Sequence, residues 1–422
     1  MKNTRSRTDV QICSSNIHAL KKLRLTTNRV GKIFSYANSI FVLAILCQLF
    51  GCTQDYADVA TIVIPNNSNR LIGDASDLNL IIDSITISNS LTHEIGTEFT
   101  TYYELEGGLL LVDRNVSKIS CVSVTGQLLW QISSPSKDNV EYGLVGSVDV
   151  DRDNGKIYID DRMNSKIDIF NLSGEYMSSL NSVLYYQDFT SLDEDRFIFD
   201  IANIGQNYGK DTIPKRLMTI AKDDSEDIVL FSQNYWNENP DIVPVSNQNR
   251  FNTVGNTLQH RRPFEDTVYI VNKSLDVEPI LKFSFNVGSD FVDLASNKNT
   301  PDVWLELNEQ NLPEPNLILY NQEKSIAYCS YWQGNLSYFA ILTNGEASFA
   351  PSRYIQTNKD ILKVPMYYSD GTFFQQMFKK ERNLVNKTLS RGSERQINTQ
   401  LDSINSVLDD RDDIIVYSMK FG

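Results

Sequence analysis

Carboxylates at alternating positions are the first group in the chain with the chemistry of a ligand site. Asp149, Asp151 and Asp153 are followed by Asp160, at the twelfth position counted from Asp149. Alternating oxygen ligands closed by an acid at position twelve are the pattern of a calcium-binding EF-hand loop. That loop needs glycine at position six and glutamate at position twelve, whereas this chain has Asn154 and Asp160 there. The flanking residues alternate as strands, so the sequence favours a hairpin turn over calcium, and we expect no cofactor.

A second candidate is the cationic cluster of His260, Arg261 and Arg262. Because arginine pairs with carboxylates in a bidentate manner, this cluster could hold an anionic ligand. The alternative is a solvated loop with no ligand. Trp236 and Trp332 lie near predicted loops, where they could stack on sugars or peptide side chains, and core packing is the alternative for both.

Motifs of known catalytic chemistry are missing from the sequence. It contains no Ser-His-Asp arrangement with a nucleophile elbow, no phosphate-binding loop and no pair of histidines at zinc-binding spacing. Carboxylates are plentiful, but nothing in their spacing singles out an acid–base pair. The sequence therefore favours a binding protein, and it leaves an enzyme open as the alternative.

An internal repeat indicates which elements hold these residues. Residues 112–119, followed by Gly126, reappear as residues 160–167, followed by Gly174, and every matched pair lies 48 positions apart. Each copy predicts a strand, a turn containing Asp-Arg, a second strand, a glycine turn and a third strand. A period of roughly 40–50 residues built in this way is typical of a propeller blade. A β-sandwich is the alternative, but the repeat favours sheets arranged around an axis.

The rest of the chain divides into regular and irregular segments. We predict one propeller domain over residues 75–422, with a loop insertion at about 203–262 and a helical insertion at about 374–408. The final segment, 413–421, has the pattern of a strand. Pairing it with an N-terminal strand at 80–87 would close the ring and remove its exposed edges.

The first residues have the pattern of a secretory signal. Residues 1–51 contain a basic stretch and then a twelve-residue apolar run, too short for the roughly 20 residues that span a bilayer. The run ends at Leu49-Phe50-Gly51-Cys52, which resembles the lipobox of bacterial lipoproteins, where a diacylglycerol is attached to the cysteine sulfur. We expect lipid on Cys52 and a polar tether over 52–74. A single membrane anchor with a free cysteine is the alternative.

The charge balance bears on possible partners. The leader, residues 1–51, carries eight Lys or Arg against one acid, or +7, so the rest of the chain carries −14 − 7 = −21. Nucleic acid binding requires a basic surface, so nucleic acid is excluded as a partner. An acidic body keeps a protein soluble and favours cationic partners.

Several of these patterns together resemble a known family. Residues 105–180 are similar to the six-bladed β-propeller lipoproteins of Bacteroidota, distant relatives of NHL-repeat propellers, in which a strand ending in an acid precedes a Lys-Ile strand and a glycine turn. Residues 140–143, Val-Glu-Tyr-Gly, occupy the place of a Gly-Glu-Tyr element, without the Gly-Pro-Gly that usually precedes it. Residues 266–288 and 414–417 match further stretches. The resemblance implies six blades, although residues 75–422 have room for seven units of 48.

The predicted fold is therefore all-β, a six-bladed propeller of four-stranded antiparallel blades. The resemblance implies a lipid-anchored protein of the cell envelope, on the periplasmic or surface side of the outer membrane, and it transfers no catalytic residue. We expect it to bind a glycan, peptide or protein through blade-top loops or the axial mouth. The alternatives are a lyase- or glycosidase-type enzyme acting on envelope or dietary polymers and an accessory subunit of an outer-membrane complex.

Overall fold

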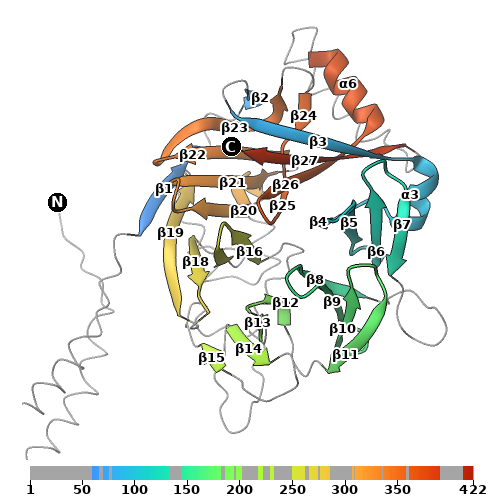
Figure 1. Ribbon diagram of the computed structural model, residues 1–422. Coiled ribbons are helices and arrows are strands. Elements are labelled where there is room, and N and C mark those ends of the chain that lie inside the picture. The colour runs from blue at the N-terminus through green and yellow to red at the C-terminus, as the bar shows by residue number, and fades with distance from the viewer. Residues whose placement is uncertain are drawn as a thin grey trace, which may run out of the picture. The chain divides into compact units, whose positions relative to one another are not determined.

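Six sheets surround a common axis in the computed structural model (Figure 1). The structure describes residues 59–65, 70–75, 78–132, 144–181, 186–193, 196–201, 217–221, 229–231, 250–261, 266–273, 276–285, 307, 309–334, 336–357, 361–389 and 412–421. Each sheet contains a blade of four antiparallel strands. The blades are numbered in chain order, and the strands of each blade are given from the axis outward. The leader, residues 1–51, and Cys52 lie outside the described residues.

Blades 1 to 3 follow one another along the chain. Blade 1 contains β4 (Thr101–Leu105), β5 (Gly108–Asp113), β6 (Lys118–Ser123) and β7 (Leu128–Ile132). Blade 2 contains β8 (Val145–Asp151), β9 (Lys156–Asp161), β10 (Lys166–Asn171) and β11 (Tyr176–Asn181). Blade 3 contains β12 (Tyr186–Ser191), β13 (Arg196–Ile201), β14 (Leu217–Ala221) and β15 (Val229–Phe231).

Blades 4 to 6 include strands from the N-terminal region. Blade 4 contains β16 (Phe251–Val254), β17 (Thr257–His260), β18 (Thr267–Val271) and β19 (Val277–Phe285), and β1 (Ala60–Ile64) adds to its outer edge. Blade 5 contains β20 (Pro313–Asn321), β21 (Ile326–Gln333), β22 (Leu336–Thr343) and β23 (Glu346–Gln356), with β2 (Arg70–Asp74) and β24 (Ile361–Lys363) against β23. Blade 6 contains β25 (Tyr367–Ser369), β26 (Thr372–Phe378), β27 (Ile414–Phe421) and β3 (Leu80–Ile87). The two helices described at length are α3 (Asn89–Ile95) and α6 (Lys379–Leu389).

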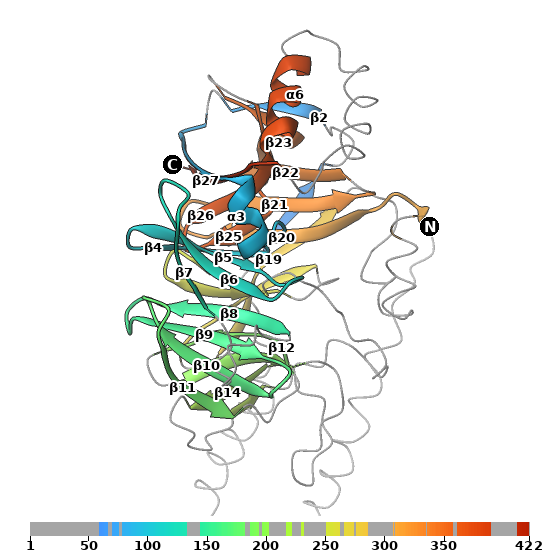
Figure 2. The ribbon, with the colours of Figure 1, turned by 90° about the vertical axis from the view of Figure 1, so that its right-hand side faces the viewer.

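The 48-residue repeat corresponds to blades 1 and 2, which stack face to face in Figure 2. Asp113 pairs with Lys118 at the end of the β5–β6 hairpin, and Asp161 pairs with Lys166 at the same place in β9–β10. Both faces of the middle strands are buried, because each blade packs its sheet between two neighbours. The predicted propeller and its repeat are confirmed.

The ring is closed by pairing of the N-terminal strand β3 with β27, the last strand of the described residues. The outermost strand of blade 6, β3, pairs with β27 along eight residues, from Leu80 with Phe421 to Ile87 with Ile414. The other three strands of that blade come from the C-terminal part of the chain. The expected pairing of residues 80–87 with 413–421 is therefore present.

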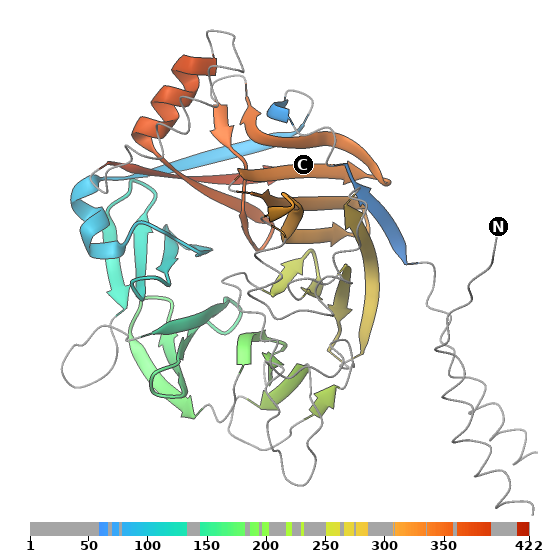
Figure 3. The same ribbon diagram turned by 180° about the vertical axis from the view of Figure 1, so that it is seen from behind.

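Three boundaries differ from the sequence expectation. The segment 52–74, expected to be a polar tether, contains β1 and β2, which pair in parallel with β19 and β23 (Figure 3). Ile62 and Ile64 of β1 are buried against blade 4, but two isoleucines are too short a pattern to stand out among polar neighbours. The segment 203–262, expected to be a loop, supplies β14 to β17.

The third difference concerns the expected helical insertion, 374–408. Its first apolar residues, Phe374 and Met377, lie on β26, where they contact blades on opposite sides of the sheet. Their separation of three residues imitates a helical repeat. The helix α6 occupies only residues 379–389, and the rest of the segment lies outside the described residues. None of the helices in the described ranges is long and apolar enough to cross a membrane.

Candidate functional site

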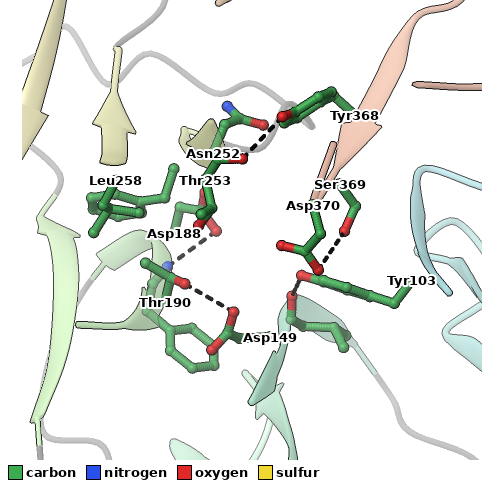
Figure 4. Close-up of a pocket in the computed structure, with 13 residues that line it drawn as sticks. Tyr103, Asp149, Asp188, Thr190, Asn252, Thr253, Leu258, Tyr368, Ser369 and Asp370 are labelled. Atoms are coloured by element: carbon green, nitrogen blue, oxygen red, sulfur yellow. Dashed lines mark hydrogen bonds between the residues drawn. The ribbon is translucent and has the colours of Figure 1, made fainter. Parts of the chain in front are cut away.

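A pocket on the propeller axis is lined by the innermost strands of five blades. Side chains from β4, β8, β12 and β16 and from the β25–β26 hairpin surround it, as Figure 4 shows. The pocket has a volume of about 40 Å³. A wider cavity of about 320 Å³ shares Tyr103, Asp149, Thr190, Thr253 and Asp370 with it. We call the first cavity the axial pocket and the second the outer mouth.

Two carboxylates of the axial pocket are fixed by hydrogen bonds that join neighbouring blades. Asp149 of blade 2 accepts hydrogen bonds from the Thr190 hydroxyl (2.8 Å) and the Ser191 amide (2.9 Å) of blade 3. Asp188 of blade 3 accepts one from the Arg250 amide (2.6 Å) at the start of blade 4. Both carboxylates are buried and are positioned by backbone groups, so their place at the axis is set by the ring itself.

The third carboxylate, Asp370, is held more loosely. It lies in the tight turn between β25 and β26 at a positive φ of 46°, and its neighbour Gly371 has φ of 86°. Its oxygen lies 3.1 Å from the Arg152 guanidinium of blade 2, and these side chains are 33% and 42% exposed. An ion pair this exposed contributes about 0–1 kcal/mol. A cation from a ligand could therefore replace Arg152 beside Asp370 at little cost.

The residues that line the outer mouth carry an excess of negative charge. The outer mouth is lined by five carboxylates, against only Arg152 and Lys273 as cations: its acids are Asp149, Asp151, Asp153, Asp193 and Asp370. At the boundary with the axial pocket, Tyr103 donates a hydrogen bond to the Val148 carbonyl (2.7 Å). Burial, followed by the nearby carboxylates, raises the pKa of Tyr103 well above its usual range, so the phenol stays protonated. The cavity suits a positively charged group.

The four acids of the EF-hand-like motif do not surround a common point. Both oxygens of Asp151 are hydrogen bonded to Asn154 within the hairpin turn, and Asp153 is exposed in the same turn. Asp160 lies at the far end of β9, where its oxygens accept hydrogen bonds from Tyr186 and Arg162. Among the described residues there is no group of three or more His, Cys, Asp or Glu side chains placed to hold a metal ion.

A hairpin turn at this position, favoured from the sequence, is therefore confirmed. Asp149, the first acid of the motif, lines the axial pocket together with residues of other blades rather than with the rest of the motif.

The two residues of the cationic cluster that the structure describes, His260 and Arg261, lie inside the protein. His260 is buried with its Nε2 atom 3.2 Å from Asp200, and Arg261 donates a hydrogen bond to the Asn316 carbonyl (2.9 Å) of blade 5. Both side chains thus join blades. Arg262 lies outside the described residues, and an anion site at this cluster stays a prediction.

Close to this cluster, burial raises the pKa of Glu314 to about 8, against the opposing effect of the Arg261 charge. At neutral pH this carboxyl therefore keeps its proton to a large extent.

Of the two candidate tryptophans, Trp332 belongs to the described residues. Trp236 lies outside the described residues. Trp332 is partly exposed at the end of β21, where it lines a cavity between blades 5 and 6.

Of the residues that line the axial pocket, only Asp149 was singled out from the sequence. The missed residues include three on which the site depends: Tyr103, Asp188 and Asp370. Asp370 had a usable signal, because Asp-Gly between two apolar segments indicates a tight hairpin turn. No pattern marks the other two, since their partners are more than 40 positions away in the sequence.

Comparison with known proteins gives the same architecture. A family model described as a 6-bladed beta-propeller matches residues 100–383. A solved structure of a Bacteroides fragilis protein that is presumed to be exported has a TM-score of 0.63 at 14% identity, covering 86% of this chain and 100% of its own. No curated protein has a matching sequence.

Two further solved structures match with lower TM-scores. A member of the duf4221 family from Bacteroides vulgatus has a TM-score of 0.46 at 10% identity, covering 82% of this chain and 99% of its own. Virginiamycin B lyase from Staphylococcus aureus has a TM-score of 0.38 at 12% identity, covering 70% and 85%. The match to the family model extends over more than half of the chain and agrees with the six sheets around the axis. The chain belongs to this family of six-bladed β-propellers.

Proposed function

We propose that this propeller is a binding protein of the cell envelope that takes the positively charged group of a ligand into its axial pocket. The observation that carries the proposal is the set of carboxylates from blades 2, 3 and 6: three of them line the axial pocket, and five line the outer mouth against two cations. Ligands with a free amine, such as a basic peptide or an amino sugar, have the matching chemistry.

The rigidity of the site supports binding. Asp149 and Asp188 are positioned by hydrogen bonds between blades, so no rearrangement is needed before a ligand enters. Asp370, with its exposed partner Arg152, is the group that can exchange one cation for another. The outer mouth, at about 320 Å³, is at the lower end of the roughly 300–1,000 Å³ of small-molecule sites.

Replacement of Asp370 by asparagine is expected to weaken binding of a cationic ligand by about tenfold, because the amide keeps the shape and removes the charge. The probes are glucosamine and trilysine, each compared with its N-acetylated, uncharged form by titration calorimetry at low salt. Only the charged forms should bind, and added salt should weaken their binding.

The matched control is Glu323→Gln, which removes an exposed acid from the corresponding turn of blade 5, away from the pocket. Equal binding of charged and acetylated probes, or full binding by D370N, would contradict the proposal. Turnover of either probe would instead support the lyase or glycosidase alternative.

The location in the cell envelope rests on the leader sequence. We propose that Cys52 carries the lipid that its lipobox-like context implies. Eight positions separate Cys52 from Ala60, where β1 begins, and that length of chain spans at most roughly 29 Å. A lipid on Cys52 would therefore keep the outer edge of blade 4 close to the membrane surface.

Cys52→Ser is expected to abolish lipid attachment and release the protein from membranes. The measurement is incorporation of a labelled fatty acid in a bacterial host with lipoprotein processing, combined with intact mass. Cys47→Ser, five positions earlier in the leader, is the matched control and should remain labelled. Labelling of C52S, or an unlabelled wild type, would remove the lipid anchor from the proposal.

A further inference from the structure

A second cavity, of about 180 Å³, lies between blades 5 and 6 and shares no lining residue with the axial pocket. On β21, Trp332 points to the same side of the sheet as Tyr328, which packs against Phe373 of blade 6. On β26, Gln375 points to the same side as Phe373, toward blade 5. Trp332 and Gln375 therefore lie on the two facing surfaces. We call this cavity the interblade pocket.

The interblade pocket contains a buried hydrogen-bond acceptor without a donor. Gln375 is 5% exposed, and its Nε2 atom donates to the Gln376 carbonyl (2.9 Å). This bond identifies the other amide atom as oxygen, and that Oε1 atom is enclosed with no hydrogen-bond partner. A buried acceptor left unsatisfied costs about 1–3 kcal/mol. A hydroxyl or N–H group entering the cavity could satisfy it.

Aromatic rings border the same cavity. Trp332 is 36% exposed, so a ligand can reach its ring. Tyr367 contacts Tyr102, whose ring centre lies 5.3 Å away, and Phe378 also lines the cavity. Rings that are accessible on one face and rigid give a flat apolar platform. A platform combined with an enclosed acceptor matches a ring that has C–H groups on its face and hydroxyl groups at its edge.

The charges in the wall balance. Lys363 of β24 lies 3.4 Å from Glu381 of α6, and these are the two charged residues that line the cavity. Glu381 is buried, and a buried carboxylate is tolerated when it is paired. With no net charge in its wall, the interblade pocket has no preference for an ion, in contrast to the acidic axial pocket. The matching ligand is uncharged.

We propose that the interblade pocket binds one neutral saccharide unit. The sugar ring lies against Trp332, and one of its hydroxyl groups donates a hydrogen bond to the Oε1 atom of Gln375. This site goes beyond the axial function proposed above and does not depend on it. An envelope glycan bound here would leave the axial pocket open to a second, cationic ligand.

The test uses the methyl glycosides of glucose, galactose, mannose and N-acetylglucosamine as probes, with binding measured by saturation-transfer NMR. At least one glycoside should bind the wild type, and Trp332→Ala should weaken its binding about tenfold. Gln375→Leu should also weaken it, because leucine cannot accept the hydrogen bond of the sugar hydroxyl, and thermal unfolding checks that the variant stays folded without its bond to the Gln376 carbonyl. W332F, which keeps a ring, should retain part of the affinity.

Two control variants distinguish the interblade pocket from exposed rings elsewhere on the surface and from the axial pocket. Tyr176→Ala removes a comparably exposed ring from β11 of blade 2 and should leave glycoside binding unchanged, as should D370N in the axial pocket. No binding of any glycoside, or equal binding by wild type and W332A, overturns the proposal. Binding of an uncharged acetylated tripeptide that is lost in W332A assigns the pocket to peptides and also overturns it. If W332A fails to fold, Q375L and W332F decide the question.

Discussion

Deletion of residues 1–87 is expected to abolish the cooperative unfolding transition of the propeller, whereas deletion of residues 1–58 is expected to leave it unchanged. The first deletion removes β3, which pairs with β27 over its whole length. It also removes Ile87, which is fully buried between blades 6 and 1, and exposes the edge of β27. Because each blade is stabilised by stacking on two neighbours, a defect in one opens the ring. Circular dichroism during heating measures the transition.

An intermediate deletion, of residues 1–78, distinguishes the effect of opening the ring from the effect of losing strands at the outer edge of a blade. It removes β1 and β2, which add to the outer edges of blades 4 and 5, but it keeps β3. This variant should unfold cooperatively at a lower temperature than the wild type. A normal transition in the 1–87 deletion would show that the terminal strands are not needed for closure.

The sequence predicted the parts of the fold that are built from local signals. Blades 1 and 2 were predictable because their turns place Ser117 and Ser165, and Gly126 and Gly174, at positive φ at matching positions of the repeat. Strands β16 and β17 have four residues each, too few for an alternating pattern to be distinguished from a polar loop. Their pairing with the rest of blade 4 depends on the ring around them.

The candidate site was less predictable than the fold, for a geometric reason. The axial pocket receives a few side chains from the innermost strands of several blades, so Tyr103, Asp188 and Asp370 meet although no local motif contains them. His260 and Arg261 were predicted as candidate ligand-binding residues because adjacent charged residues in a sequence resemble a ligand site. The structure places both in bonds between blades. In this fold, the residues that line one pocket therefore come from several innermost strands that no local motif connects.

Replacement of Arg250 by methionine is expected to lower the free energy of unfolding by about 3–5 kcal/mol, the usual cost of removing one partner of a buried ion pair. Arg250 is 2% exposed, and its Nη1 atom lies 2.9 Å from Asp200, which is fully buried. The carboxylate also contacts His260 at 3.2 Å. Without the guanidinium, the negative charge of Asp200 loses this buried cation in the core between blades 3 and 4. Urea unfolding measures the loss.

The double variant R250M/D200L tests whether the charge or the packing is responsible. Replacing both partners by apolar side chains removes the buried charge, so the double variant should be more stable than R250M alone. Arg196→Met provides the partly exposed control on blade 3, which also contains Asp200. Arg196 pairs with Asp193 and donates a hydrogen bond to the Lys273 carbonyl of blade 4, so its loss should cost about 1–2 kcal/mol, less than the loss of Arg250. An R250M variant as stable as R196M would mean that the Arg250–Asp200 pair does not hold blades 3 and 4 together. Apolar packing between the two sheets, through residues such as Ile198 and Phe251, would then be the dominant contribution.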